Sequence, residues 1–133
     1  MNGAPAVTLS HALAVASGAA AGALLRWFTA LWLNNAWAGF ALGTLAVNCV
    51  GGLLIGVSLE VFARAPNEFL RLLLVTGFLG GFTTFSAFSA ESLSLLQAGR
   101  WSLAALHSAA HVLGALACTA LGHGLARLLW ARG

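Results

Sequence analysis

Long apolar stretches separated by short polar connections dominate the chain. The stretches cover about residues 9–33, 38–63, 69–97 and 102–130. Each is long enough to cross the hydrocarbon core of a bilayer, which takes roughly 20 apolar residues in a helix. The pattern therefore predicts an all-α membrane protein with four transmembrane helices, and a single integral membrane domain over residues 1–133.

The third stretch contains an interruption, GFLGGFTTFSAFS, over residues 77–89. Gly lowers helix stability by about 1 kcal/mol relative to Ala, and the adjacent β-branched threonines add a smaller penalty. We therefore expect the third helix to break mid-membrane, near Gly80 to Thr84. Lipid offers no partners to freed backbone groups, so such a break is tolerated where it lines a cavity or binds an ion. The stretch is thus a candidate ion site.

The composition supports lipid as the solvent. Hydrophobic residues make up 60% of the chain and charged residues only 7%, against about 25% charged in soluble domains. The net charge is +3, but the arginines are scattered singly and form no basic stripe, so we expect no nucleic-acid partner. The expected surroundings are a lipid bilayer, and no catalytic site is predicted.

Polar residues in the second stretch share one helix face. Thr44, Asn48 and Gly52 are spaced four apart. Taken alone, Asn48 is typical of an interhelical hydrogen bond. Opposite a broken helix, the same residue is also suited to lining an aqueous path, and the sequence leaves both roles open.

Two phenylalanines follow the expected break. Phe85 and Phe88 lie three apart and project from neighbouring positions. Phe pairs usually pack against each other, but their ring edges are electropositive and suit a small anion. Glu91 follows by a further near-turn, and it fits either a vestibule or the exit from the membrane.

The fourth stretch carries His107 and His111, one helical turn apart. Such a pair can bind Zn²⁺, but no Glu stands between the two residues and no Cys or acid falls at ligand spacing. We therefore favour a pore-lining or hydrogen-bonded polar face. Cys49 and Cys118 read as small packing residues rather than as a disulfide or metal site.

Arginines locate the membrane ends. Arg26 falls within the first apolar stretch, where it is either functional or snorkels toward the interface near Trp27 and Trp32. With four spans, both termini share one side, and that side holds Arg64, Arg71, Arg127 and Arg132. The other side holds Arg100 and, depending on its depth, Arg26. The positive-inside rule favours cytoplasmic termini, but the excess is small enough to allow insertion in both orientations.

Three motifs together resemble one family. GFLGGFTTFSAFSAE (77–91) is similar to the third-helix signature of the Fluc (CrcB) fluoride channels. Gly22-Ala-Leu-Leu-Arg26 resembles the glycine–arginine motif of their first helix, and GTLAVN (43–48) resembles a second-helix motif. The resemblance covers essentially the whole chain.

The resemblance implies a fluoride-selective channel that passively exports F⁻ across the bacterial inner membrane, lowering cytoplasmic fluoride. It implies an antiparallel, dual-topology homodimer with two fluoride paths, and a structural Na⁺ at the dimer interface held by the backbone carbonyls of Gly80 and Thr83. Fluoride-pathway roles fall on Arg26, Thr44, Asn48, Thr84, Phe85, Ser86, Phe88, Glu91, His107 and His111. At the two histidine positions family members tend to have Tyr and Ser.

Within that resemblance, Phe85 and Phe88 form an aromatic box, Asn48 is the pore asparagine and Arg26 the vestibule arginine. Two other functions stay open as alternatives. A small H⁺-coupled multidrug-type transporter carries a Glu in its first helix, and this first helix has none. A non-transporting membrane assembly subunit predicts that helix packing alone explains every polar residue.

Overall fold

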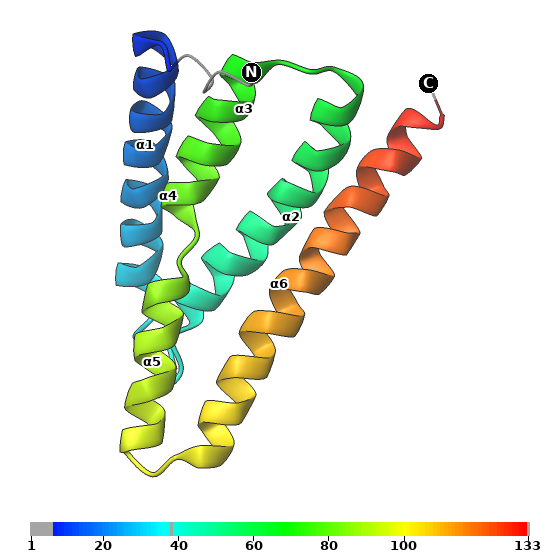
Figure 1. Ribbon diagram of the computed structural model, residues 1–133. Coiled ribbons are helices and arrows are strands. Elements are labelled where there is room, and N and C mark those ends of the chain that lie inside the picture. The colour runs from blue at the N-terminus through cyan, green and yellow to red at the C-terminus, as the bar shows by residue number, and fades with distance from the viewer. Residues whose placement is uncertain (1–6, 38, 133) are drawn as a thin grey trace, which may run out of the picture.

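The computed structural model describes residues 7–37 and 39–132 and contains, in these ranges, four helices long and apolar enough to cross a membrane. They are α1 (Leu9–Leu33), α2 (Leu42–Arg64), a composite third helix (Glu68–Gln97) and α6 (Trp101–Trp130). The start of α1 and the end of α6 lie at the same end of the bundle (Figure 1). The predicted all-α fold with four membrane-capable helices is confirmed.

The third helix is built from four pieces. They are α3 (Glu68–Arg71), the π-helix η1 (Leu72–Leu79), α4 (Gly80–Phe82) and α5 (Phe85–Gln97). Thr83 and Thr84 between α4 and α5 are extended, with ψ of 161° and 120°. The predicted interruption is therefore confirmed, and it is visible as the link between α4 and α5 (Figure 1).

The break is narrower than expected, because Gly80 and Gly81 stay helical. A Cβ at Gly81 would meet the backbone of Ala19 on α1. This glycine therefore serves close helix packing rather than unwinding, and the helix gives way only at the β-branched pair Thr83 and Thr84.

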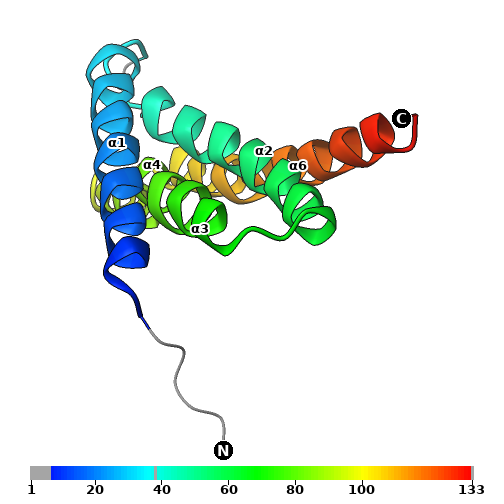
Figure 2. The same ribbon diagram turned by 90° about the horizontal axis from the view of Figure 1, so that it is seen from above.

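Small residues set how the helices pair. α1 lies against η1 and α4, while α2 lies mainly against α6 (Figure 2). A Cβ at Gly22 would meet the backbone of Phe78, and one at Gly56 would meet the backbone of Thr119. Backbones therefore touch at both interfaces, as small residues allow in membranes. Gly18, one turn before Gly22, also allows this approach, because a Cβ there would meet the backbone of Leu73 and Phe78.

The second helix begins later than predicted. Residue 38 lies outside the described residues, and α2 starts only at Leu42. Asn34 explains the delay, because its side-chain oxygen accepts a hydrogen bond from the backbone N–H of Thr44 at 3.1 Å. That contact satisfies one of the free donors at the start of α2 and holds the preceding loop against it.

A carboxylate is buried near the end of α2. Glu60 lies within this helix and is 8% exposed. Its carboxylate pairs with Arg64 at 2.6 Å, one helical turn later. The ion pair explains how a carboxylate is buried there, since buried charges are paired.

Candidate functional site

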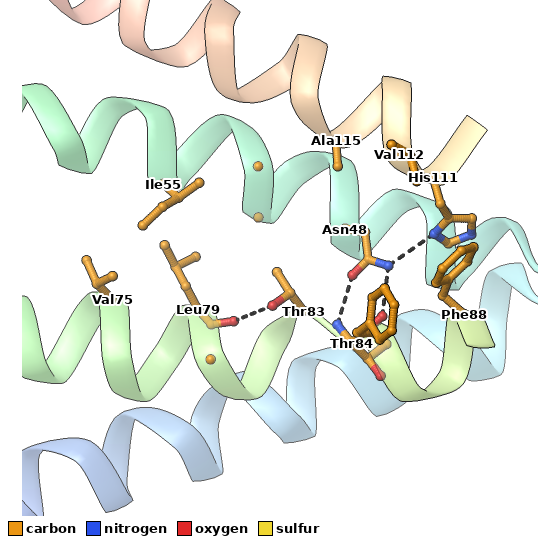
Figure 3. A pocket seen from close by; sticks show the side chains of 14 residues that line it. Asn48, Ile55, Val75, Leu79, Thr83, Thr84, Phe88, His111, Val112 and Ala115 are labelled. Carbon is orange, nitrogen blue, oxygen red and sulfur yellow. Dashed lines mark hydrogen bonds between the residues drawn. The ribbon is translucent and has the colours of Figure 1, made fainter. Parts of the chain in front are cut away.

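The break in the third helix is held by one side chain from α2. The backbone N–H of Thr84 donates to the side-chain oxygen of Asn48 at 2.8 Å, and the Asn48 amide N–H donates back to the Thr84 carbonyl at 2.9 Å. The Thr84 hydroxyl accepts from the N–H of Ala87 at 3.1 Å and so caps α5. Asn48 thus replaces, across a helix interface, the hydrogen bonds that the interruption removes (Figure 3).

The backbone carbonyl oxygens near the break differ in whether they accept a hydrogen bond. Gly81 O accepts a hydrogen bond from Arg26 Nε at 3.0 Å. By contrast, the carbonyl oxygens of Gly80 and Thr83 receive no hydrogen bond from any described residue, because Thr84 N is turned to Asn48 and Ala87 N to the Thr84 hydroxyl. Arg26 therefore lies bound to the third helix rather than simply extended toward the headgroups.

A cavity of about 480 Å³ adjoins the break. It is lined by Asn48, Gly51, Gly52, Ile55, Val75, Leu79, Gly80, Thr83, Thr84, Phe85, Phe88, His111, Val112 and Ala115. Its polar side chains gather at one end, around Asn48 and Thr84, while Ile55, Val75 and Leu79 line the other end (Figure 3). The freed carbonyl groups belong to residues of the same cavity wall.

The two phenylalanines after the break meet edge to face. Their ring centroids are 5.3 Å apart with the planes at 62°. Phe88 turns inward and contacts His111, with ring centroids 4.8 Å apart. Phe85 is 77% exposed on the surface of the single chain. Both rings therefore border the first cavity, Phe88 from inside the bundle and Phe85 from its exposed surface.

The histidines are buried in a hydrogen-bonded cluster. His107 is fully buried and His111 is 4% exposed. His107 Nε2 lies 3.2 Å from Glu91 Oε2, and its Nδ1 lies 3.0 Å from the Ser92 hydroxyl. The Thr44 hydroxyl donates to the other carboxylate oxygen, Glu91 Oε1, at 2.6 Å. The expected polar face on α6 is present, and it is hydrogen-bonded to α2 and α5.

Asn48 also fixes the tautomer of His111. Its amide nitrogen, a donor, lies 3.1 Å from His111 Nδ1. Nδ1 must therefore accept, and the proton of the neutral ring sits on Nε2. That Nε2 is buried and has no hydrogen-bond partner among the described residues. An unpaired, buried N–H group is costly, so it calls for an acceptor.

The fold adds an acid that spacing along the sequence does not reveal. Glu91 approaches the histidine pair from α5. One ligand atom each from Glu91, His107 and His111 lies within 4.8 Å of the others, so the three residues form a group that could hold a metal ion. Spacing along one helix cannot reveal a ligand supplied by another.

A second cavity, of about 380 Å³, lies on the other side of the cluster. It is lined by Asn34, Gly39, Phe40, Ala41, Glu91, Ser94, Leu95, Ala98, Arg100 and His107. Phe88 and His111 thus face the first cavity, while Glu91 and His107 face the second. The cluster therefore contributes residues to the walls of both cavities.

The remaining predicted residues lie at the margins. Ser86 is exposed, with its hydroxyl 3.3 Å from that of Thr84. Arg26 lines neither cavity. Sequence reasoning missed Ser92, which contacts His107, and Phe40, whose ring meets His107 edge-on at 5.0 Å. Ser92 stands directly after Glu91, and its place as a polar residue inside a span was the available signal.

Taken together, the fold and site define a multi-pass membrane protein with a broken helix and a buried polar cluster. A family model described as "CrcB-like protein, Camphor Resistance (CrcB)" matches residues 13–123. The chain therefore belongs to the CrcB family.

Named relatives are similar over nearly the whole chain. A protein of Aromatoleum aromaticum is 51% identical over 122 residues, covering 90% of this chain and 93% of its own length. One of Pseudomonas aeruginosa is 54% identical over 112 residues, covering 83% and 88%. One of Chromobacterium violaceum is 50% identical over 122 residues, covering 90% and 95%. All three carry the name "Fluoride-specific ion channel FluC".

Asn48→Ala should loosen the break. It leaves the Thr84 N–H and C=O without their partners, and each unpaired buried group costs about 1–3 kcal/mol. We expect a lower melting temperature in detergent and faster hydrogen–deuterium exchange in the peptide that contains Thr84. Ser58→Ala is the matched control, because Ser58 bonds only within its own helix, to Leu54 O. Unchanged exchange at Thr84 in Asn48→Ala would contradict the bridging role.

Proposed function

We propose that this chain is a fluoride-selective channel that lets F⁻ leave the cytoplasm passively across the bacterial inner membrane, so that cytoplasmic fluoride falls. It is a channel and not an enzyme. The observation that carries the proposal is the series of hydrogen-bond donors gathered at a mid-membrane helix break, in a chain whose relatives are named fluoride-specific channels.

The donors match what a dehydrating fluoride ion needs. Fluoride is small and strongly hydrated, and stripping its water without replacement is prohibitive in hydrocarbon. The His111 Nε2–H group is a donor already desolvated and unpaired. Thr84 and Ser86, whose hydroxyls lie 3.3 Å apart at the break, offer further donors, and the Asn48 amide holds His111 in the donating tautomer. Thr44, Glu91 and His107 extend the polar track toward the second cavity.

The phenylalanines supply weak attraction between these donors. Their ring edges are electropositive, and they attract an anion without holding it as tightly as a cation would. Conduction requires sites that are weak enough to leave. Arg26, whose full charge would trap F⁻ mid-path, lies away from both cavities and bound to Gly81 O, which suits a place at the vestibule.

The functional unit we infer is an antiparallel homodimer with two fluoride paths. Phe85 is 77% exposed although it belongs to the proposed path, so the path is one-sided until a second copy covers it. The chain has no internal repeat that would supply inverted symmetry. Its arginine bias between the two membrane sides is small, which permits insertion in both orientations.

We further infer a structural Na⁺ at the dimer interface, held by the carbonyl oxygens of Gly80 and Thr83. These are the carbonyls near the break that receive no hydrogen bond from the described residues. Oxygen ligands of a broken helix suit a hard cation, as in membrane transporters. When bound, the ion supplies positive charge that compensates these dipoles and ties two subunits together. It is structural rather than transported.

Liposomes that contain the purified chain should release F⁻ but not Cl⁻, as read by ion-selective electrodes. Phe85→Ile and Phe88→Ile should each slow F⁻ release by about tenfold or more, because they remove the ring edges that replace hydration. Phe28→Ile on the lipid-facing side of α1 is the control, since that ring is 50% exposed and outside both cavities.

Absent F⁻ release, or equal Cl⁻ release, would overturn the proposed selectivity. Unchanged F⁻ release in both Phe variants would show that the two rings serve helix packing only and do not contact fluoride. Efflux of a cationic dye driven by a pH gradient would instead indicate an H⁺-coupled transporter.

Dual topology is tested by labelling from each side. In a variant without Cys49 and Cys118, Ala65→Cys places a single thiol in the connection between α2 and α3. A membrane-impermeant maleimide added outside intact inner-membrane vesicles of the expressing cells should label about half of the chains, because each antiparallel dimer places one such connection on each side. Labelling of nearly all or nearly none would show a single orientation and exclude the antiparallel dimer.

Removal of Na⁺ should weaken the dimer. Purified protein transferred from NaCl to N-methyl-D-glucamine chloride should shift toward the monomer on size-exclusion chromatography, and its melting temperature should fall, because bound ligand stabilises the folded state by mass action. Restoring NaCl should reverse both changes. A dimer that is equally stable in both salts would contradict the Na⁺ site while leaving the fluoride path untouched.

A further inference from the structure

We propose that Glu91, His107 and His111 form a binding site for a divalent transition-metal ion of the Zn²⁺ class, and that a metal ion bound there blocks the passage. The three residues come from α5 and α6, and one ligand atom of each lies within 4.8 Å of the others. This site is separate from the carbonyl groups at the break, which suit a hard cation.

The donor set fits the metal. Two imidazoles and one carboxylate are the protein ligands of many zinc sites that keep a fourth position open. Ligands about 2.0–2.1 Å from a tetrahedral zinc lie about 3.3 Å from one another. His107 Nε2 and Glu91 Oε2 are 3.2 Å apart, so this pair already has the spacing of two ligands.

Neighbouring hydroxyls orient the first two ligands. The Ser92 hydroxyl lies 3.0 Å from His107 Nδ1, and its oxygen can accept a hydrogen bond from Nδ1–H when Nε2 binds metal. The Thr44 hydroxyl donates to Glu91 Oε1 at 2.6 Å and leaves Oε2 for the ion. Partners of this kind fix ring orientation and raise ligand basicity in metal sites.

The third ligand is the one polar group that the cluster leaves without a contact. His111 Nε2 is buried, and the residue is 4% exposed. To bind metal through Nε2, the neutral ring moves its proton to Nδ1, which then faces the Asn48 amide nitrogen, donor against donor. Metal binding therefore breaks the contact between Asn48 and His111, while Asn48 keeps both hydrogen bonds to Thr84.

Blocking follows from the same proton movement. The His111 Nε2–H group cannot donate to an anion and ligate a metal at once. A bound ion also fills the junction between the two cavities, because Glu91 and His107 line one and His111 lines the other. The block of F⁻ flux rests on the proposed function, whereas metal binding itself does not.

Binding is measured first, on the dimer in detergent, with Co²⁺ as the probe. The background is Cys49→Ala/Cys118→Ala, because the two thiols are themselves soft-metal ligands. Titration should give the visible absorption bands of tetrahedral Co²⁺ at one ion per chain, and Zn²⁺ should remove them. His107→Gln and His111→Gln should each raise the apparent Kd by about tenfold or more, and His123→Gln, remote from the cluster, should leave it unchanged.

Flux is measured second, in liposomes. Micromolar Zn²⁺ should slow F⁻ release several-fold, EDTA should restore it, and the ratio of rates with and without Zn²⁺ should approach one in His111→Gln. Absent Co²⁺ bands, or bands unaffected by both Gln variants, would overturn the site. Metal binding without any slowing of F⁻ release would overturn the block. Metal binding in a protein that passes no F⁻ would instead refute the proposed function and leave the metal site standing.

Discussion

The two hydrogen bonds between Asn48 and Thr84 are the interaction on which the structure depends. A helix interrupted in hydrocarbon exposes N–H and C=O groups that lipid cannot satisfy. Asn48 supplies an acceptor to the N–H and a donor to the C=O of the same residue, Thr84, at 2.8 and 2.9 Å. Asn48 therefore stabilises the break at Thr83 and Thr84 by pairing backbone groups that would otherwise be unsatisfied. It also holds α2 against the third helix at the site.

Hydrogen-bond donors and carbonyl oxygens lie on different sides of the contact between Asn48 and Thr84. Donor groups lie on the side of α5 and α6, where Asn48 sets the tautomer of His111 and leaves its Nε2–H without a partner among residues 7–37 and 39–132. Carbonyl oxygens collect on the α4 side, at Gly80 and Thr83. In the function we propose, the donors suit the anion and the carbonyl oxygens suit the cation, both at one interruption. Arg26 stays outside it, against Gly81 O.

Much of this could be predicted from residue order alone. The composition required a membrane fold, and the helix period placed Thr44 and Asn48 on one face, where the structure finds both making contacts to the third helix. The break was predictable because β-branched residues and glycines weaken a helix. The glycines were misread, since Gly81 serves close packing against Ala19. Local propensity does not distinguish a residue that unwinds a helix from one that lets a neighbour approach.

The histidine cluster was beyond prediction for a related reason. Glu91 meets His107 only because α5 folds back against α6, and Ser92 joins them from the same turn. Side chains brought together by tertiary packing leave no spacing rule in the sequence. Likewise, the side chain of Asn34 accepts a hydrogen bond from Thr44 N–H across a loop, and this contact at the start of α2 has no signature in the sequence.

Solid-state NMR of the ¹³C-threonine-labelled protein in bilayers tests the central claim most directly. The Cα and Cβ chemical shifts of Thr83 and Thr84 report the backbone conformation at the break, between the helical residues Phe82 and Phe85. Extended shifts at both threonines are the predicted result. Helical shifts at both would show a continuous helix and would contradict the account.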